Sequence, residues 1–391
     1  MNRLARRLLL AGRVVAAVLL VLLVASFVRF GDRHEPEGGA PRDGRIVAIS
    51  GDAATFEFDD GTVATVPASE ARPGVVRIFA TLDPVLFGLA LLVLLVALAV
   101  TFYRWHMLMR AVEIDVPLGR TIRLSLIGLF FNNLVPGSTG GDVVRAFYVA
   151  RSATKRTRGV VSVLMDRIIG LTALAFMAGL VSLFRITDSR LVHVIAFILA
   201  IDLGIVVLTA VFYSKRIRRF LLLDRLFGAL PFQGVIQEID RALFLYRYEK
   251  RVVLGAFLLS FLGQSLFVAN NILIGKAVGI DLPLTTYLVL VPIAGIVSAI
   301  PLLPGGWGLG EIAYTKLFGL VSVGPNQAVS LSVLYRLGGT IWGLLGALAL
   351  AFGRERVSLA EAETALGSTA SGEAPPEPSD GELQIPNKTL E

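Results

Sequence analysis

Residues 132–145, NNLVPGSTGGDVVR, follow directly after the apolar run LSLIGLFF and interrupt it with two asparagines, a proline, glycines and charged side chains. Proline and glycine both disfavour a helix interior, so the stretch predicts one helix that ends and another that begins near Gly140 or Gly141. Lipid cannot satisfy the backbone groups freed at such a break. We therefore expect the break to lie inside protein or beside a water-filled cavity.

The composition indicates a multi-spanning membrane protein. Of the 391 residues, 55% are hydrophobic and 17% are charged, and several apolar runs have the roughly twenty residues that a helix needs to cross a bilayer. The chain has no cysteine and only three scattered histidines, so we expect no disulfide, metal centre or other cofactor. The net charge of +7 is concentrated beside apolar segments, which favours anionic lipid over nucleic acid as a partner.

The distribution of basic residues predicts the topology. Spans are expected in residues 1–30, as an uncleaved anchor with a cleaved signal peptide as the alternative, and near 84–103, 159–183, 191–213, 252–275 and 327–352. The basic flanks RWHMLMR and RSATKRTR, with Arg104 and Trp105 at a membrane interface, both belong on the cytoplasmic side. The region between them must then enter the membrane and return. The segment broken by Pro301, Pro304, Gly305 and Gly306 must do the same from the outside.

We therefore predict an all-α polytopic membrane protein with about six transmembrane helices and two re-entrant hairpins, and with both termini in the cytoplasm. Residues 31–80 alternate apolar and polar side chains between turn signals, which predicts a small extracytoplasmic β domain. The membrane domain is expected to span residues 81–353. Residues 354–391 form an acidic tail with too little apolar content to fold.

The two broken segments resemble each other. LVPGSTGGDVVRAFYV and LLPGGWGLGEIAYTKL share Leu-x-Pro-Gly and then a carboxylate, Asp142 or Glu311. An arginine follows inside the next span, 31 residues after Pro136 as Arg167 and 32 residues after Pro304 as Arg336. The units would enter the membrane in opposite orientations. Such a pattern is typical of inverted-repeat transporters, whose substrate site lies between the repeats.

Buried charges are the main candidates for function. An unpaired arginine inside a span costs about 2.5–3.5 kcal/mol, so Arg167 and Arg336 need partners. Asp142 and Glu311 are the expected counter-charges, because Asp166 is adjacent to Arg167 and faces another direction on a helix. Two readings stay open: buried ion pairs that lock the hairpins, or capture of a phosphate or carboxylate from a lipid head group.

The other polar residues also have alternative roles. Asp142 either caps its helix or contacts a substrate or ion, and Arg145 is a phosphate ligand or a partner of Asp142. Asn132 and Asn133 either satisfy the broken backbone or touch head-group hydroxyls, and Trp307 either packs or recognises substrate. Gln264, Asn270 and Asn271 suggest hydrogen bonds between helices. The candidate substrate-binding residues are Asn132, Asn133, Gly140, Gly141, Asp142, Arg145, Asp166, Arg167, Gly305, Gly306, Trp307, Glu311 and Arg336.

Together, the motifs IGLFFNNLVPGSTGGDVVRAFYVAR, SVLMDRIIGL, IPLLPGGWGLGE and LYRLGG resemble the flippase-like family, also called the lysylphosphatidylglycerol synthase transmembrane family. The resemblance covers about residues 84–352. It implies an inner-membrane protein that moves a lipid, in the best-known members an aminoacylated phosphatidylglycerol. Those members also carry a cytosolic aminoacyl-transfer domain, and the tail of this chain is too short for one. The β region lies outside the family pattern.

The leading hypothesis is a translocator of an anionic or aminoacylated phospholipid, or of a lipid-linked glycan, and not an enzyme. One alternative is an intramembrane transferase acting on a lipid phosphate, with Asp142 or Asp166 as the base. Another is an accessory subunit of an envelope glycosyltransferase that transports nothing. An envelope enzyme and a second copy of the chain are both open as partners. No G-x-x-x-x-G-K-[ST] nucleotide-binding segment occurs in the sequence.

Overall fold

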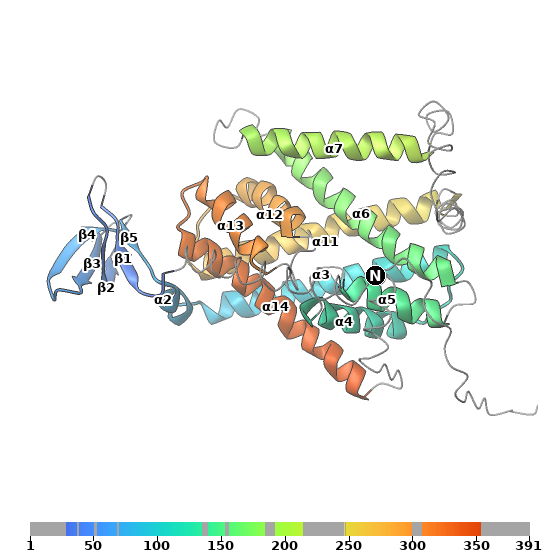
Figure 1. The fold of residues 1–391 in the computed structure, drawn as a ribbon, viewed down its shortest axis with the longest axis horizontal. Helices are drawn as coiled ribbons and strands as arrows, with labels where there is room; N and C mark the ends of the chain where they lie inside the picture. The colour runs from blue at the N-terminus through green and yellow to red at the C-terminus, as the bar shows by residue number, and fades with distance from the viewer. Residues whose placement is uncertain are drawn as a thin grey trace, which may run out of the picture.

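The computed structural model describes residues 29–36, 39–50, 53–68, 70–134, 140–152, 156–183, 192–213, 246, 248–298 and 307–352. In these residues, a small β sheet stands at one end of a bundle of helices (Figure 1). Two predicted features, the N-terminal anchor and the acidic tail, lie wholly or almost wholly outside the described residues.

The predicted β region forms a five-stranded antiparallel sheet with the strand order β4-β3-β2-β1-β5. The strands are β1 (Asp32–His34), β2 (Arg42–Ser50), β3 (Ala53–Phe58), β4 (Val63–Pro67) and β5 (Ala71–Arg72). Ile46 lies opposite Phe56, and both side chains are completely buried in a small apolar core. The alternating pattern therefore predicted this meander correctly, while its place outside the membrane stays a prediction.

Both ends of the sheet region are tied to the start of α14 (Pro325–Phe352). The side chain of Asn326 accepts a hydrogen bond from the Arg29 amide at 2.9 Å and donates one to the Pro73 carbonyl at 2.9 Å. Gly74 is required here, because a Cβ at this position would lie 2.3 Å from the Phe30 carbonyl oxygen. The chain then continues through α2 (Val75–Ala80) into the helical bundle.

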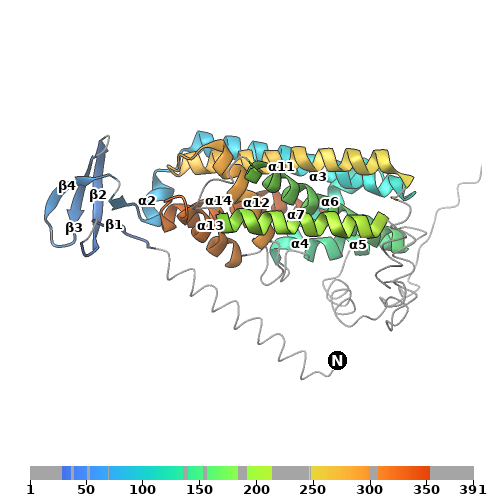
Figure 2. The same ribbon diagram turned by 90° about the horizontal axis from the view of Figure 1, so that it is seen from above.

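Two long helices, α3 (Pro84–Ala111) and α11 (Lys250–Ala277), pack side by side (Figure 2). They are antiparallel, because the Asp83 amide at the start of α3 donates to the Ala277 carbonyl at 3.4 Å. About two turns further into the pair, Asn270 donates to the Ala90 carbonyl at 2.7 Å. Asn270 therefore joins two helices, as the sequence predicted.

Each long helix is followed by a short pair and a second long helix. After α3 come α4 (Leu118–Leu134), α5 (Gly140–Ser152) and α6 (Arg156–Ser182), and after α11 come α12 (Leu284–Ser298), α13 (Leu309–Gly319) and α14. The first short helix of each run packs against the last long helix of the other run: α4 against α14, and α12 against α6. The remaining helix, α7 (Val192–Tyr213), packs against α6.

Among the described residues, four helices are long and apolar enough to cross a membrane: α3, α6, α11 and α14. They correspond to four of the six predicted spans. The predicted span at 191–213 forms α7, whose apolar part, Val192–Val207, is shorter than those four helices. The predicted first span lies outside the described residues. A total of six spans therefore stays a prediction.

The two interrupted segments are helix pairs. Helix α4 has 17 residues and α5 has 13, while α12 has 15 and α13 has 11. At about 1.5 Å per residue each is shorter than the roughly 30 Å hydrocarbon core. The partners α4 and α5 pack together, as do α12 and α13. The connecting residues 135–139 and 299–306, which include Pro136, Gly305 and Gly306, lie outside the described part.

The close contact between α4 and α14 predicts a sharp difference between two glycines of α14. A Cβ on Gly346 would lie 2.0 Å from the backbone oxygen of Leu126 on α4, whereas a Cβ on Gly339 would meet open space. Because backbone cannot move aside easily, Gly346→Ala should lower stability by about 1–3 kcal/mol. Gly339→Ala should be neutral or slightly stabilising. Thermal unfolding of both variants in detergent tests this, and an equal response would contradict the described contact.

Candidate functional site

The two arginines inside apolar spans have the counter-charges that the sequence predicted. Arg167 on α6 pairs with Asp142 in the first turn of α5. Arg336 on α14 pairs with Glu311 in the first turn of α13, with 2.8 Å between Nε and Oε1. In both pairs the arginine follows its carboxylate by 25 residues. The first turn of a short helix is therefore joined to the next long helix in the same way twice.

The Glu311–Arg336 pair is almost completely enclosed. The Arg336 side chain is 8% exposed and that of Glu311 is 3% exposed. Glu311 also accepts hydrogen bonds from the Gly308 amide and from the Ser332 hydroxyl. Gly308 has a φ of 79°, a conformation that favours glycine. The pair therefore fixes both the start of α13 and its contact with α14.

Asp166 does face away from Arg167, as expected for adjacent residues on a helix. Its carboxylate pairs with Arg104 of α3, with 2.8 Å between Nε and Oδ1. Arg104 also donates to the Ser260 hydroxyl on α11 at 2.7 Å. The prediction that Arg104 marks a membrane interface misses this role, because it rested on the basic sequence around Arg104. Folding brings α6 and α11 against that side of α3.

Arg145 lies at the centre of the same cluster. Its guanidinium carbon is 3.9 Å from the centroid of the Trp105 ring. Its Nη1 is 3.4 Å from Asp142 and 3.6 Å from Asp166. The residue is only 8% exposed, yet its Nε and Nη2 atoms have no hydrogen-bond partner among the described residues. The arginine thus has two buried donors left over after its contacts with both aspartates.

We call these five residues the arginine cluster; its members are Arg104, Asp142, Arg145, Asp166 and Arg167. Three arginines and two aspartates give the cluster a formal charge of +1. An excess buried cation is costly inside a membrane protein. A single negative charge placed beside Arg145 would balance the cluster and give the free donors an acceptor.

Asparagines hold the break before α5. The Asn132 side chain accepts a hydrogen bond from the Gly141 amide at 2.7 Å, so it satisfies a backbone donor at the start of α5. A Cβ on Gly141 would lie 2.0 Å from the Gly128 carbonyl oxygen, which explains the glycine. Asn133 donates to the Leu129 carbonyl within its own helix and accepts from Thr340 of α14 at 3.4 Å. Asn132 therefore satisfies backbone at the break, whereas Asn133 joins α4 to α14; a contact of either with a head group stays a prediction.

A cavity of about 290 Å³ lies beside Arg336. Its polar lining consists of Gln264, Ser298, Tyr314, Tyr335 and Arg336, and apolar side chains of α6, α11 and α12 complete the wall. Such a mixture of apolar walls with a few convergent polar groups is typical of ligand sites.

Trp307 and Asn271 lie near the Glu311–Arg336 pair but make no hydrogen bond with Glu311. Trp307 is 38% exposed, and its ring centroid is 5.7 Å from the guanidinium carbon of Arg336. Asn271 accepts a hydrogen bond from the Tyr314 hydroxyl at 2.7 Å. Gly305 and Gly306 lie outside the described residues.

The helix runs α3–α6 and α11–α14, here called the first and second halves, have different types of side chain at matching positions. The residue three positions after the carboxylate is Arg145 in one half and Tyr314 in the other. The residue before the paired arginine is Asp166 in one half and Tyr335 in the other. The sequence comparison detected the charged pairs but missed these tyrosines, because tyrosine in an apolar helix gives no signal separate from ordinary packing. The first half is therefore rich in charge, and the second is aromatic.

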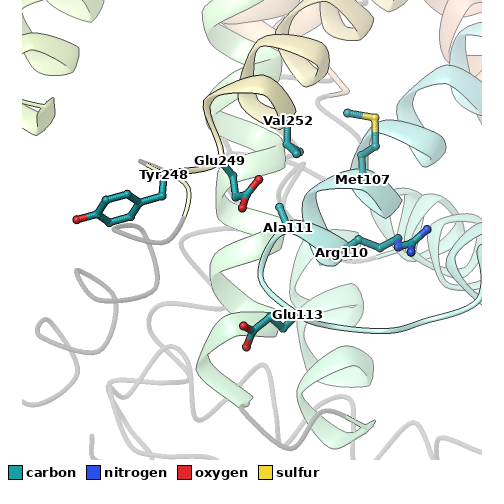
Figure 3. Close-up of a pocket in the computed structure, with 7 residues that line it drawn as sticks. All are labelled: Met107, Arg110, Ala111, Glu113, Tyr248, Glu249 and Val252. Carbon is teal, nitrogen blue, oxygen red and sulfur yellow. The ribbon is translucent and has the colours of Figure 1, made fainter.

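A second pocket, of about 490 Å³, lies where α3 ends and α11 begins (Figure 3). Its charged lining residues are Arg110, Glu113 and Glu249. Glu113 also pairs with Arg158, and its side chain is 73% exposed. Within the described ranges, no three His, Asp or Glu side chains gather into a metal site.

The long apolar helices and the enclosed ion pairs define a multi-pass membrane protein. The chain belongs to the family described as the lysylphosphatidylglycerol synthase TM region, which matches residues 74–347. The match begins just after β5, so the β sheet lies outside it.

Curated relatives carry the name UPF0104 membrane protein. The protein PH1989 of Pyrococcus horikoshii is 28% identical over 272 residues, which cover 64% of this chain and 81% of the relative. Two proteins of Methanothermobacter thermautotrophicus are also similar. One is 27% identical over 282 residues, covering 65% of this chain and 81% of the relative. The other is 25% identical over 275 residues, covering 63% and 78%.

Loss of the buried Arg104–Asp166 pair should be more damaging than loss of the Arg158–Glu113 pair, whose carboxylate is exposed. Arg104→Met leaves a buried carboxylate without its closest cation and should cost about 3–5 kcal/mol. Arg158→Met removes the partner of an exposed glutamate and a hydrogen bond to the Val112 carbonyl, and should cost about 0.5–2 kcal/mol. Thermal unfolding in detergent measures both, and the double variant Arg104→Met/Asp166→Asn should recover part of the loss. Similar stability of the two single variants would contradict a buried pair.

Proposed function

We propose that the protein moves a phosphate-bearing anionic lipid between the leaflets of a bacterial or archaeal inner membrane. The head group passes through the polar interior between the two interrupted segments, while the acyl chains stay in the bilayer. An aminoacylated phospholipid, which also carries a phosphate, belongs to the same class of cargo. The arginine cluster binds the phosphate and takes part in no bond-breaking step.

The observation that carries the proposal is the pair of buried donor atoms, Nε and Nη2 of Arg145, that have no partner among the described residues. A phosphodiester is an anion, and it would lie beside the three guanidinium groups of the arginine cluster. Its oxygens suit the two donors of Arg145 that lack a partner among the described residues, because a guanidinium fork binds phosphate at two atoms. Asp142 lies in the first turn of α5, where the helix dipole also favours an anion.

We further propose that the two helix runs are inverted repeats and that both interrupted segments are re-entrant hairpins. Matching helix lengths, the exchanged packing of α4 with α14 and α12 with α6, and the antiparallel α3 and α11 support this arrangement. In inverted-repeat transporters the substrate site lies where the repeats meet. The cavity beside Arg336 provides a second polar surface for the head group.

The direction of movement follows from the membrane potential. Moving one elementary charge across 100 mV is worth about 2.3 kcal/mol. With the cytoplasm negative, this free energy drives an anionic lipid outward and opposes a cationic one. An anionic cargo therefore needs no other energy source.

Lipid exchange in liposomes tests the proposal. We expect the wild-type protein to speed the exchange of fluorescent phosphatidylglycerol between leaflets, and to have less effect on a fluorescent glycolipid without phosphate. Arg145→Ala should slow phosphatidylglycerol exchange about 10- to 100-fold, because hydrogen bonds to a charged group contribute about 1.5–3 kcal/mol. Arg158→Ala, which removes an arginine outside the arginine cluster whose partner Glu113 is exposed, serves as the control and should exchange lipid like wild type.

Three outcomes would overturn the proposal. The wild-type rate could equal that of protein-free vesicles. Arg145→Ala could exchange phosphatidylglycerol as fast as the control variant. Finally, Asp142→Asn could abolish the formation of a chemically altered lipid without changing the distribution of lipid between the leaflets. That result would instead identify an intramembrane transferase.

A further inference from the structure

Asp202 is a carboxyl group that the proposed lipid pathway does not use. It lies near the middle of α7, in the sequence FILAIDLGIVV, and it is the only Asp, Glu, Lys or Arg in Val192–Tyr213. Its side chain is half-buried. An ionisable residue in such an apolar helix is costly unless it is compensated, and it therefore indicates a function.

The carboxyl group of Asp202 packs directly on the backbone of α6. A Cβ on Gly179 would lie 1.8 Å from Oδ2 of Asp202, so only glycine leaves room for this oxygen. Asp202 makes no hydrogen bond or ion pair with any described residue. By contrast, Asp142, Asp166 and Glu311 each have an arginine partner.

Among the described residues of α6 and α7, no charged side chain lies close to Asp202. On α6, residues 171–182 include no ionisable side chain, and Arg167 is 12 residues from Gly179, about 18 Å along the helix. On α7 itself, His193 is nine residues away, or about 14 Å. The only ionisable group on α12 is Tyr287, whose hydroxyl donates to the Ile280 carbonyl.

We propose that Asp202 is a proton-binding site, and that its neutral form keeps α7 packed against α6. An ionised Asp202 would have no cation and no hydrogen-bond donor among the described residues to replace its lost water, so it takes up a proton when it enters the contact with Gly179. Release of the proton favours movement of the carboxylate toward water and loosens α7. The inference concerns a proton and one helix contact, and it holds whether or not the protein moves lipid.

Carbodiimide labelling of the full-length protein in lipid nanodiscs tests the proton site. Dicyclohexylcarbodiimide is apolar and reacts with protonated carboxyl groups. Mass spectrometry should find Asp202 labelled at neutral pH and the labelling lost as the pH rises. Exposed Glu113 should stay unlabelled at neutral pH, and the adduct should be missing from Asp202→Asn. Absence of labelling at Asp202 at neutral pH, or labelling of Glu113 to the same degree, would overturn the proposal.

Hydrogen exchange tests the consequence for α7. After correction for the intrinsic rate, the α7 amides of wild type should lose protection as the pH rises, whereas those of Asp202→Asn should keep it. A parallel response of the two proteins would contradict the contact role. If Asp202→Asn does not fold, the labelling of wild type still decides the proton site. Neither readout depends on lipid movement, so failure here is distinct from failure of the proposed transport.

Discussion

Compensation of buried charge is the constraint on which the rest of this structure depends. Two short helices begin at breaks where lipid could not satisfy the backbone, and each is joined to the following long helix by a carboxylate–arginine pair. Removing either partner would leave an uncompensated charge in an apolar bundle. The same pairs therefore hold the broken segments in position and provide the polar interior that a head group would need.

The carboxylate–arginine pair occurs in both halves, but the side chains around it differ. Around Asp142 and Arg167, two more arginines and a second aspartate build a charged cluster with an excess cation. Around Glu311 and Arg336, tyrosines and Gln264 line a cavity. The two regions are built alike but lined differently. The arginine cluster suits an anion, and the cavity beside Arg336 offers hydroxyl and amide groups to an uncharged or hydroxyl-rich group. A head group with both kinds of chemistry would find complementary surfaces in a single chain.

The sequence predicted those parts of the structure that follow from local pattern or from the cost of an isolated charge. Four long spans, the β meander, and the partners of Arg167 and Arg336 fall in this class. Arg104 and Trp105 do not, because their roles arise only when α5, α6 and α11 pack against α3. Asp202 drew no prediction from the sequence, because its contact with Gly179 depends on tertiary packing.

The attachment of the sheet through Asn326 has a mechanical consequence. The segment that enters the sheet, at Arg29, and the segment that leaves it, at Pro73, both bind Asn326 in the first turn of α14. The same helix carries Arg336. A force applied to the sheet is therefore transmitted to that helix through two short hydrogen bonds and a few residues of backbone. Any molecule that binds the sheet would therefore also act on α14, the helix that places Arg336 inside the bundle.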